Sequence, residues 1–217
     1  MAADKASATP EKPRLQARKQ PLQARSAATV GVILEAAARI LEERGLTGLN
    51  TNLVAQRAGV SIGSLYQYFP GKEALLAALI RDARAGLLEA VQQICAQGGL
   101  LSTQLRVLIR AAVHHQLHRP QLMRHLEYAE LMLPLDQETA ALNDALLNAL
   151  QDLLVAHAVQ EADVTARDLI AISRGMIDSA GLAGESDAAA LENRVWRAVS
   201  GYLYRFRQDQ SPPFVSC

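Results

Sequence analysis

The hydrophobic positions along the chain recur mostly at helical spacing. Ile33, Ala37, Ile40 and Leu41 occupy positions i, i+4, i+7 and i+8, which form one apolar stripe along a helix. No segment keeps the period-two alternation of a half-buried strand. Alanine and leucine dominate the chain, and both residues favour helices. The pattern therefore predicts an all-α fold.

Capping residues and glycine or proline breaks divide this pattern into about nine helices. Ser26 or Thr29 is expected to cap the first helix, and Gly45 to end it. Further N-terminal caps are expected at Thr51, Ser61, Thr165 and the pair Ser186-Asp187. The expected helices cover residues 26–45, 51–58, 62–68, 72–96, 102–118, 121–132, 136–160, 165–182 and 187–207.

Residues 50–72, NTNLVAQRAGVSIGSLYQYFPGK, hold two very short helical patterns around Gly59-Val60-Ser61. This arrangement predicts a helix-turn-helix at about residues 50–69, in which Gly59 supplies the conformation that the turn requires. The second helix of such a unit enters the DNA major groove. Leu65 and Phe69 are expected to face the core. The outward positions are expected to be Ile62, Gly63, Ser64, Gln67 and Tyr68.

These outward positions suit a helix that reads a groove without a long basic side chain. Ser64 and Gln67 can hydrogen-bond base edges, and Ile62 can contact a thymine methyl group. Groups that can reach phosphates belong to Tyr66, Tyr68 and Lys72. Three aromatic residues within four positions can equally be ordinary core. The residues alone leave both interpretations open.

The net charge of zero conceals an asymmetry between the two parts of the chain. Residues 1–81 hold 11 Lys/Arg against 6 Asp/Glu, whereas residues 82–217 hold 11 against 16. A basic N-terminal part favours a polyanionic partner. Residues 1–25 are expected to form a disordered basic arm that either lies along a nucleic-acid groove or only improves solubility.

The remaining composition argues against several other classes of protein. No apolar run reaches the ~18 residues of a membrane span, so a cytoplasmic location without membrane association is expected. Cys95 and Cys217 form no disulfide framework, and Cys95 is expected to be structural. No phosphate loop, nucleophile elbow or telling carboxylate pair is present, so neither an enzyme nor a cofactor is expected.

Histidines in the middle of the chain invite a metal hypothesis that remains the weaker one. His114 and His118 lie at i and i+4 on one helical face, a spacing that zinc sites use. No third ligand is placed beside them, so no metal site is predicted. One of these histidines could instead line a ligand pocket, and plain structural roles are the simplest alternative.

Residues 27–87 resemble the TetR/AcrR family of bacterial transcriptional regulators. The resemblance rests on ILEAAARILEERG followed by LNTNLVAQRAGVSIGSLYQYFPGKEALL. The positions that agree are Gly45, Thr51, Ala55, Ala58, Gly59, Val60, Ser61, Leu65, Tyr66, Phe69, Lys72, Glu73 and Leu75. Small departures occur at Asn50, Val54 and Pro70, and none of them threatens the fold.

The resemblance implies a three-helix DNA-binding domain at residues 26–87 and a helical ligand-binding and dimerisation domain at residues 88–217. It implies a homodimer on a palindromic operator in double-stranded DNA, most often a repressor that a small-molecule inducer releases. Thr51, Tyr66 and Lys72 would contact phosphates, and Asn52 a base or the backbone. The groove-facing set would be Ile62, Gly63, Ser64, Gln67 and Tyr68.

Candidates for the pocket and the dimer interface come from the later helices. Polar or soft residues inside apolar patterns can line a cavity, namely Arg110, His114, His118, Tyr128, Met132, Arg174 and Met176. Broad apolar faces late in the chain, with Leu191, Val195, Trp196 and Val199, predict a dimer interface or simply core. The resemblance implies that the helices at about 165–182 and 187–207 form the dimer bundle, which places Trp196 and Tyr202 near the interface. A helical adaptor that binds only protein is the alternative function, and salt-sensitive DNA binding would separate the two.

Overall fold

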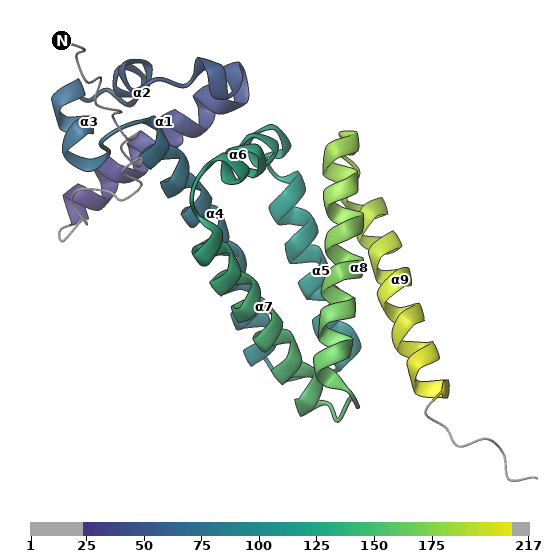
Figure 1. Ribbon diagram of the computed structural model, residues 1–217. Coiled ribbons are helices and arrows are strands. Elements are labelled where there is room, and N and C mark those ends of the chain that lie inside the picture. The colour runs from purple at the N-terminus through teal and green to yellow at the C-terminus, as the bar shows by residue number, and fades with distance from the viewer. Residues whose placement is uncertain (1–23, 210–217) are drawn as a thin grey trace, which may run out of the picture. The chain divides into compact units, whose positions relative to one another are not determined.

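A computed structural model describes residues 24–209, and all the regular structure in that range is helical (Figure 1). The helices are α1 (Ala24–Gly48), α2 (Thr51–Ala58), α3 (Ile62–Tyr68), α4 (Lys72–Ala96), α5 (Leu101–Leu117), α6 (Pro120–Met132), α7 (Asp136–Ala156), α8 (Ala162–Ala183) and α9 (Ala188–Asp209). The predicted all-α class is therefore confirmed. Most of the expected basic arm lies outside the described residues.

The chain divides into two compact units between Leu79 and Ile80, within α4. Unit 1 holds α1, α2, α3 and the beginning of α4, and unit 2 holds the rest of α4 and α5 to α9. The sequence had suggested a boundary near residue 87. Because α4 is one continuous helix, no linker marks the boundary in the sequence.

The apolar stripe of α1 forms the centre of unit 1. Ile33, Ala37, Ile40 and Leu41 are all fully buried, and α1 packs against α2, which in turn packs against α3. From α3, Leu65 is fully buried, and Phe69, which follows its last residue, is 1% exposed. Burying a large apolar side chain contributes about 1.5–3 kcal/mol. These two anchors therefore fix a helix of only seven residues, too short to be stable alone.

Local hydrogen bonds set the ends of the two short helices. Asn50, not Thr51, caps α2, because its Oδ1 accepts from the Leu53 amide at 2.9 Å. Ser61 caps α3 as expected, and its Oγ accepts from the Ser64 amide at 3.0 Å. Gly59 ends α2 with φ 68° and ψ 27°, the left-handed conformation.

Gly45 also differs from its expected role. It has φ 64° and ψ −172° and interrupts α1, but helical turns resume after it, and α1 ends at Gly48. The glycine therefore bends the chain where it was expected to stop the helix.

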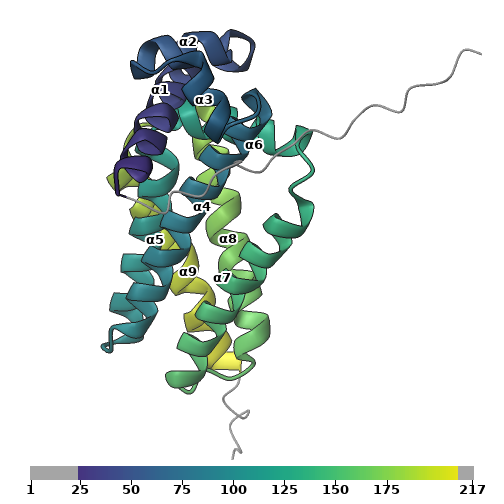
Figure 2. The same ribbon diagram turned by 90° about the vertical axis from the view of Figure 1, so that its left-hand side faces the viewer.

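Unit 2 is a bundle in which α5, α8 and α9 pack against one another and α7 packs along α8 (Figures 1 and 2). Its buried apolar core comprises Leu105, Ile109, Val113, Leu150, Leu153, Leu154, Ala162, Ala166, Leu169, Ile177, Ala180, Leu191, Val195 and Val199. Asp187 caps α9 as predicted, since its Oδ1 accepts from the Ala190 amide at 2.9 Å. Thr165 does not cap α8, which begins at Ala162 and buries Thr165 completely.

A buried polar contact closes one end of the bundle. Gln104 is only 5% exposed. Its Nε2 donates to the Ile94 carbonyl at 3.2 Å, and its Oε1 lies 2.9 Å from His157 Nε2. Because an amide oxygen can only accept, the His157 ring donates this hydrogen bond. The contact ties α4, α5 and the C-terminal end of α7 together, and α7 ends at Ala156 rather than near residue 160.

Substitution of Gly59 by alanine should destabilise unit 1. A Cβ at positive φ costs about 1–2 kcal/mol, even though the space beside Gly59 is open. Gly63→Ala is the matched control, because Gly63 is helical and its Cβ would meet only Ser61 Oγ at 3.9 Å. That control should be neutral or slightly stabilising. Urea unfolding measures both, and equal stability of Gly59→Ala and the wild type would contradict the turn assignment.

Candidate nucleic-acid interface and ligand cavity

Helix α3 exposes the residues that the sequence assigned to its outer face. Ile62 is 37% exposed, Gly63 and Gln67 are exposed, and Ser64 and Tyr68 are half-buried. The buried Leu65 and Phe69 hold the opposite side. The short helix therefore presents small, apolar and amide groups to solvent from a fixed support, which is the arrangement that groove reading requires.

The three aromatic residues after the turn, Tyr66, Tyr68 and Phe69, have different roles. Only Phe69 is core. The Tyr66 side chain is 41% exposed, and its hydroxyl lies 3.0 Å from Thr51 Oγ1. The Tyr68 hydroxyl accepts a hydrogen bond from Ser26 Oγ at 3.3 Å. The tyrosines thus connect α3 to α2 and α1 through their hydroxyls, and the interpretation as ordinary core holds for Phe69 alone.

The remaining predicted DNA contacts lie at helix starts. Asn52 and Lys72 are exposed in the first turns of α2 and α4. The Ser64 hydroxyl is 2.8 Å from Ser61 Oγ, so capping already engages one of its lone pairs or its proton. Sequence reasoning did not select Asn50, whose side chain accepts from the Leu53 amide and orders the start of α2.

Ion pairs at the surface of unit 1 neutralise two of its arginines. Arg57 forms a two-pronged ion pair with Glu43, which lowers the pKa of Glu43 through the hydrogen bond and raises that of Arg57. Arg39 pairs with Glu35 at 2.9 Å. Six of the 11 Lys/Arg in residues 1–81 lie in residues 1–25. The charge asymmetry of the sequence therefore originates mainly in the expected arm.

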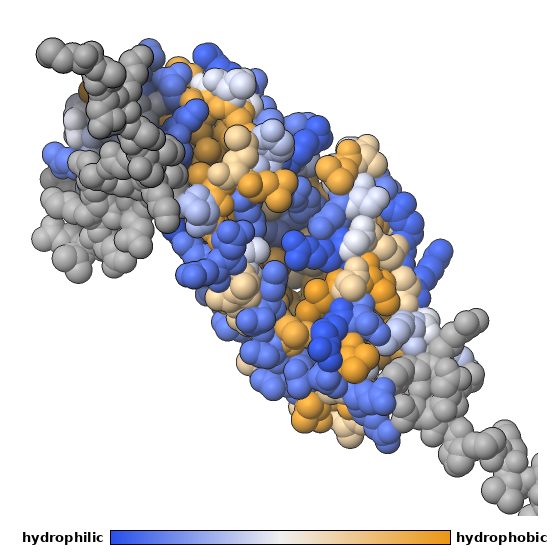
Figure 3. Space-filling view, in the orientation of Figure 1, coloured by the Kyte–Doolittle hydropathy of each residue, from blue (hydrophilic) through white to orange (hydrophobic). Residues whose placement is uncertain are grey.

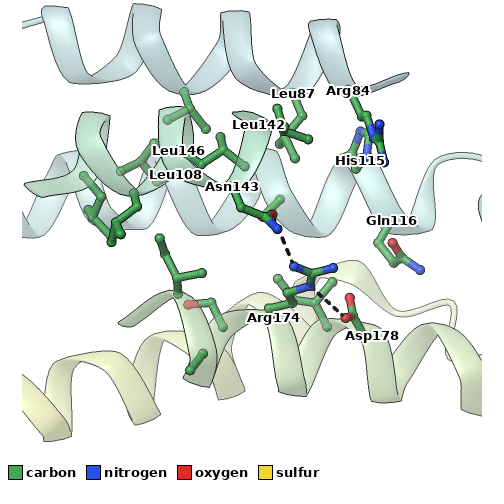
Figure 4. A pocket seen from close by; sticks show the side chains of 18 of the residues that line it. Arg84, Leu87, Leu108, His115, Gln116, Leu142, Asn143, Leu146, Arg174 and Asp178 are labelled. Atoms are coloured by element: carbon green, nitrogen blue, oxygen red, sulfur yellow. Dashed lines mark hydrogen bonds and ion pairs between the residues drawn. The ribbon is translucent and has the colours of Figure 1, made fainter. Parts of the chain in front are cut away.

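Unit 2 contains a cavity of about 620 Å³ among α4, α5, α6, α7 and α8 (Figure 4). This volume is within the range of small-molecule sites. Its walls are mostly apolar, and they include Leu87, Val91, Leu105, Leu108, Ile109, Leu126, Leu142, Leu146, Leu147, Leu150, Leu169, Ile170 and Ile177. Such walls suit an apolar body with few polar groups.

A polar cluster joins α4, α6 and α7 at the cavity. Arg84 forms an ion pair with Glu130 and donates to Thr139 Oγ1. The Thr139 hydroxyl lies 2.9 Å from Glu130 Oε1. Arg84 Nη1 is buried and has no hydrogen-bond partner. Sequence reasoning did not select this cluster, because the whole of α5 separates Arg84 from Glu130 and Thr139 along the chain.

Three further polar residues line the cavity from α5 and α6. The buried Gln116 donates through Nε2 to Glu127 Oε1 at 2.7 Å. Gly181 in α8 leaves room for this amide, since a Cβ there would lie 2.7 Å from Gln116 Nε2. His115 also lines the cavity, and burial, with a smaller contribution from His114, lowers its pKa. His115 is therefore uncharged near neutral pH.

Of the seven predicted pocket residues, only Arg174 lines this cavity. Its side chain is 62% exposed, and its guanidinium contacts Asp178 at 3.4 Å and Asn143 Oδ1 at 3.5 Å, the two contacts marked in Figure 4. Arg110 instead pairs with Glu192 at the surface. Exposed Tyr128 and Met132 and half-buried Met176, which packs on the core, do not line it either.

The histidine that lines the cavity is His115, which follows the predicted His114 by one position. His114 and His118 are exposed, and their rings stack with centroids 4.7 Å apart. His115, one residue on, points along a different face of α5 and is half-buried. Within the described residues, no group of three His, Cys, Asp or Glu is arranged to hold a metal ion.

Three of the five predicted interface residues belong to the core of the protomer itself. Leu191 and Val195 are fully buried and Val199 is 2% exposed, because the apolar face of α9 packs on α5 and α8. Trp196 is half-buried, with the Arg106 guanidinium 4.7 Å above its ring. Tyr202 donates to Asp168, which raises the pKa of Tyr202 to about 12.

Two other properties of the described residues bear on the sequence analysis. Cys95 is half-buried against the core, and burial raises the pKa of its thiol, which favours the unreactive protonated form. None of the described helices combines the length and the apolarity that a membrane crossing requires.

Comparison with known proteins matches residues 33–79 to the family "Bacterial regulatory proteins, tetR family". The fatty acid metabolism regulator protein of Bacillus subtilis (strain 168) is 24% identical over 149 residues, which are 67% of this chain and 75% of that protein. The matched family consists of regulatory proteins and not of enzymes.

Solved structures share the fold at low sequence identity. A TetR-family transcriptional regulator of Mesorhizobium loti MAFF303099 superposes with a TM-score of 0.70 at 18% identity, over 84% of this chain and 98% of that one. The complex of SmeT with triclosan gives 0.58 at 20% identity, over 79% and 90%. SmeT is the repressor of a multidrug efflux pump of Stenotrophomonas maltophilia. Residues 33–79 therefore match the helix-turn-helix region of the TetR family of bacterial regulatory proteins, and the described chain shares its fold with solved TetR-family regulators.

Proposed function

We propose that this chain is a cytoplasmic repressor that binds a palindromic operator as a homodimer and releases it when a small molecule fills the cavity. The observation that carries the proposal is the combination of two features. Unit 1 exposes a capped and anchored α3, and unit 2 encloses about 620 Å³ between mostly apolar walls. A protein-only adaptor needs neither feature.

The DNA contacts that we propose are divided between positioning and reading. Thr51, Tyr66 and Lys72 would contact phosphates, which fixes the register of α3 without reading sequence. Asn52 would contact a base or the backbone. Sequence reading would fall to Ile62, Gly63, Ser64, Gln67 and Tyr68 on the exposed side of α3.

The dimer that we propose uses the outer faces of α8 and α9 instead of the buried residues. On α8, Val164, Ala171, Gly175 and Leu182 share one exposed side, and Leu182 is 70% exposed. Figure 3 shows apolar surface over the C-terminal end of this helix. A second copy would cover this apolar surface and place two α3 helices about 34–36 Å apart, one turn of DNA.

The inducer is expected to be mainly apolar. The fatty acid metabolism regulator and the triclosan complex of SmeT both carry names that concern apolar compounds, and the cavity walls here have the same character. A ligand lowers operator affinity only to the extent that it binds the DNA-free form better. Helix α4 contributes residues to the cavity and continues from unit 1, so it is the proposed route of coupling.

Selection of bound duplexes from a random pool tests the DNA-binding proposal directly. A palindrome with half-sites about one helical turn apart is the expected product. Binding should weaken steeply as salt rises, because phosphate contacts release counterions. If no sequence is enriched at low salt, the adaptor alternative replaces this proposal.

Variants of α3 and its neighbours should separate reading from positioning. Gln67→Ala is expected to reduce discrimination at one base pair by about 1–3 kcal/mol, while Lys72→Ala should weaken binding to all sequences alike and reduce the salt slope by about 1. Fluorescence anisotropy on the selected operator and on single-base variants measures both effects. Unchanged selectivity of Gln67→Ala would exclude this orientation of α3.

Gly175→Arg should convert the dimer to a monomer. No atom lies within 4 Å of a Cβ built at Gly175, so the arginine fits the protomer but adds a charged side chain to the proposed interface. Gly86→Arg on α4 is the control, since its Cβ is equally unobstructed. Light scattering after size-exclusion chromatography reports the mass. A dimeric Gly175→Arg variant would place the interface elsewhere.

A further inference from the structure

The arginines that line the cavity are all paired with carboxylates. Arg84 pairs with Glu130, Arg174 with Asp178 at 3.4 Å, and Arg167 with Asp163 at 2.6 Å. His115, the one histidine among the described lining residues, is uncharged near neutral pH because burial disfavours its protonated form. Among the described lining residues, each arginine therefore already has a carboxylate partner, and Arg84 keeps only its Nη1 donor for a ligand.

Glu127 is a half-buried carboxylate of this lining, and no described residue forms an ion pair with it. Its Oε1 accepts from Gln116 Nε2 at 2.7 Å, and an amide carries no net charge to neutralise it. Gln116 is only 6% exposed and is packed against Gly181, so the amide holds the carboxylate in a fixed orientation. Asp144 also lines the cavity, but it is exposed, and water screens its charge.

The neighbourhood of Glu127 is a polar end on an otherwise apolar cavity. Glu127 and Glu130 are three residues apart on α6 and both line the cavity. Arg84 neutralises Glu130 alone, so this end carries a net negative charge. At roughly 30 Å³ for each water-sized group, 620 Å³ has room for about 20 non-hydrogen atoms.

The form of the cation follows from the residues in the lining. Quaternary ammonium groups are typically caged by aromatic rings, and the part of the lining that the structure describes includes no Phe, Tyr or Trp. A carboxylate accepts hydrogen bonds from a primary ammonium group, and such charge-assisted bonds are about twice as strong as neutral ones. A protonated amine therefore suits Glu127 better than a quaternary head.

We propose that the cavity binds an amphipathic amine, with its ammonium group hydrogen-bonded to Glu127 and its hydrocarbon chain along Leu87, Leu142 and Leu146. The assignment specifies the chemical class of the inducer, and its regulatory meaning rests on the function proposed above. It differs from the anionic or neutral character that the names of the relatives would suggest.

Displacement of an environment-sensitive fluorescent dye from the full-length protein compares four probes with the same alkyl chain. The probes are decylamine, decyltrimethylammonium, decanol and decanoate, each held below its micelle concentration. Decylamine should displace the dye at a concentration about tenfold lower than decanol, because one charge-assisted hydrogen bond corresponds to at least that factor. Decyltrimethylammonium should be weaker than decylamine, and decanoate the weakest.

Glu127→Gln provides the test of position. The variant keeps the shape of the side chain and an oxygen that can accept from Gln116, but it removes the charge. Decylamine should then displace the dye at about the same concentration as decanol, and the affinity for decanol should not change. Glu89→Gln is the matched control, because Glu89 is an exposed carboxylate on α4 that bonds Gln93 and does not line the cavity. It should retain the full advantage.

The outcomes separate this inference from the proposed function. If decanoate or decanol binds most tightly, or if Glu127→Gln retains the preference for decylamine, the amine assignment is wrong and an apolar inducer remains possible. If decylamine binds through Glu127 but leaves operator affinity unchanged in an anisotropy titration, the site stands and its role as inducer site fails. If no probe displaces the dye, the amine assignment fails, while DNA binding is still decided by the selection of bound duplexes.

Discussion

The seating of α3 in the core of unit 1 is the constraint on which this unit depends. Seven residues cannot sustain a helix in water, so α3 exists because Leu65 and Phe69 are buried and because α3 packs on α2, which packs on α1. The Ser61 cap and the left-handed Gly59 then fix where the helix begins and how the chain approaches it. On the outer side of α3, Ile62, Gly63 and Gln67 are exposed, whereas Ser64 and Tyr68 also form hydrogen bonds within unit 1.

In unit 2, the apolar faces of the helices pack mainly against one another within the protomer. The broad apolar face of α9 packs against α5 and α8, and Leu191 and Val195 on this face are completely buried. The cavity is the part of the interior that these contacts leave unfilled. Polar groups at its edge are satisfied mainly by one another, as in the Arg84, Glu130 and Thr139 cluster, so a ligand meets a largely pre-organised wall.

Sequence reasoning was reliable where a property is local. The helix periodicity, the Ser61 and Asp187 caps, and the burial of Phe69 follow from spacing and from residue chemistry within a few positions. It was unreliable where the outcome depends on distant helices. Asn50 and Thr51 are both good caps, and only the actual backbone decides between them. Arg84 and Glu130 lie on helices that α5 separates in sequence, and the choice of His115 over His114 depends on how α5 is rotated in the bundle.

The contact between Gln116 and Gly181 has a consequence for how this protein can diverge. Gly181 is fixed by the amide that packs on it, and that amide in turn aims the Glu127 carboxylate. A substitution at Gly181, which contacts the Gln116 amide from α8, would therefore reorient the Glu127 carboxylate in the cavity wall. No residue that a ligand contacts would itself be altered. Duplicated copies of such a gene could acquire new effectors through substitutions in α8, and an inventory of wall residues alone would overlook them.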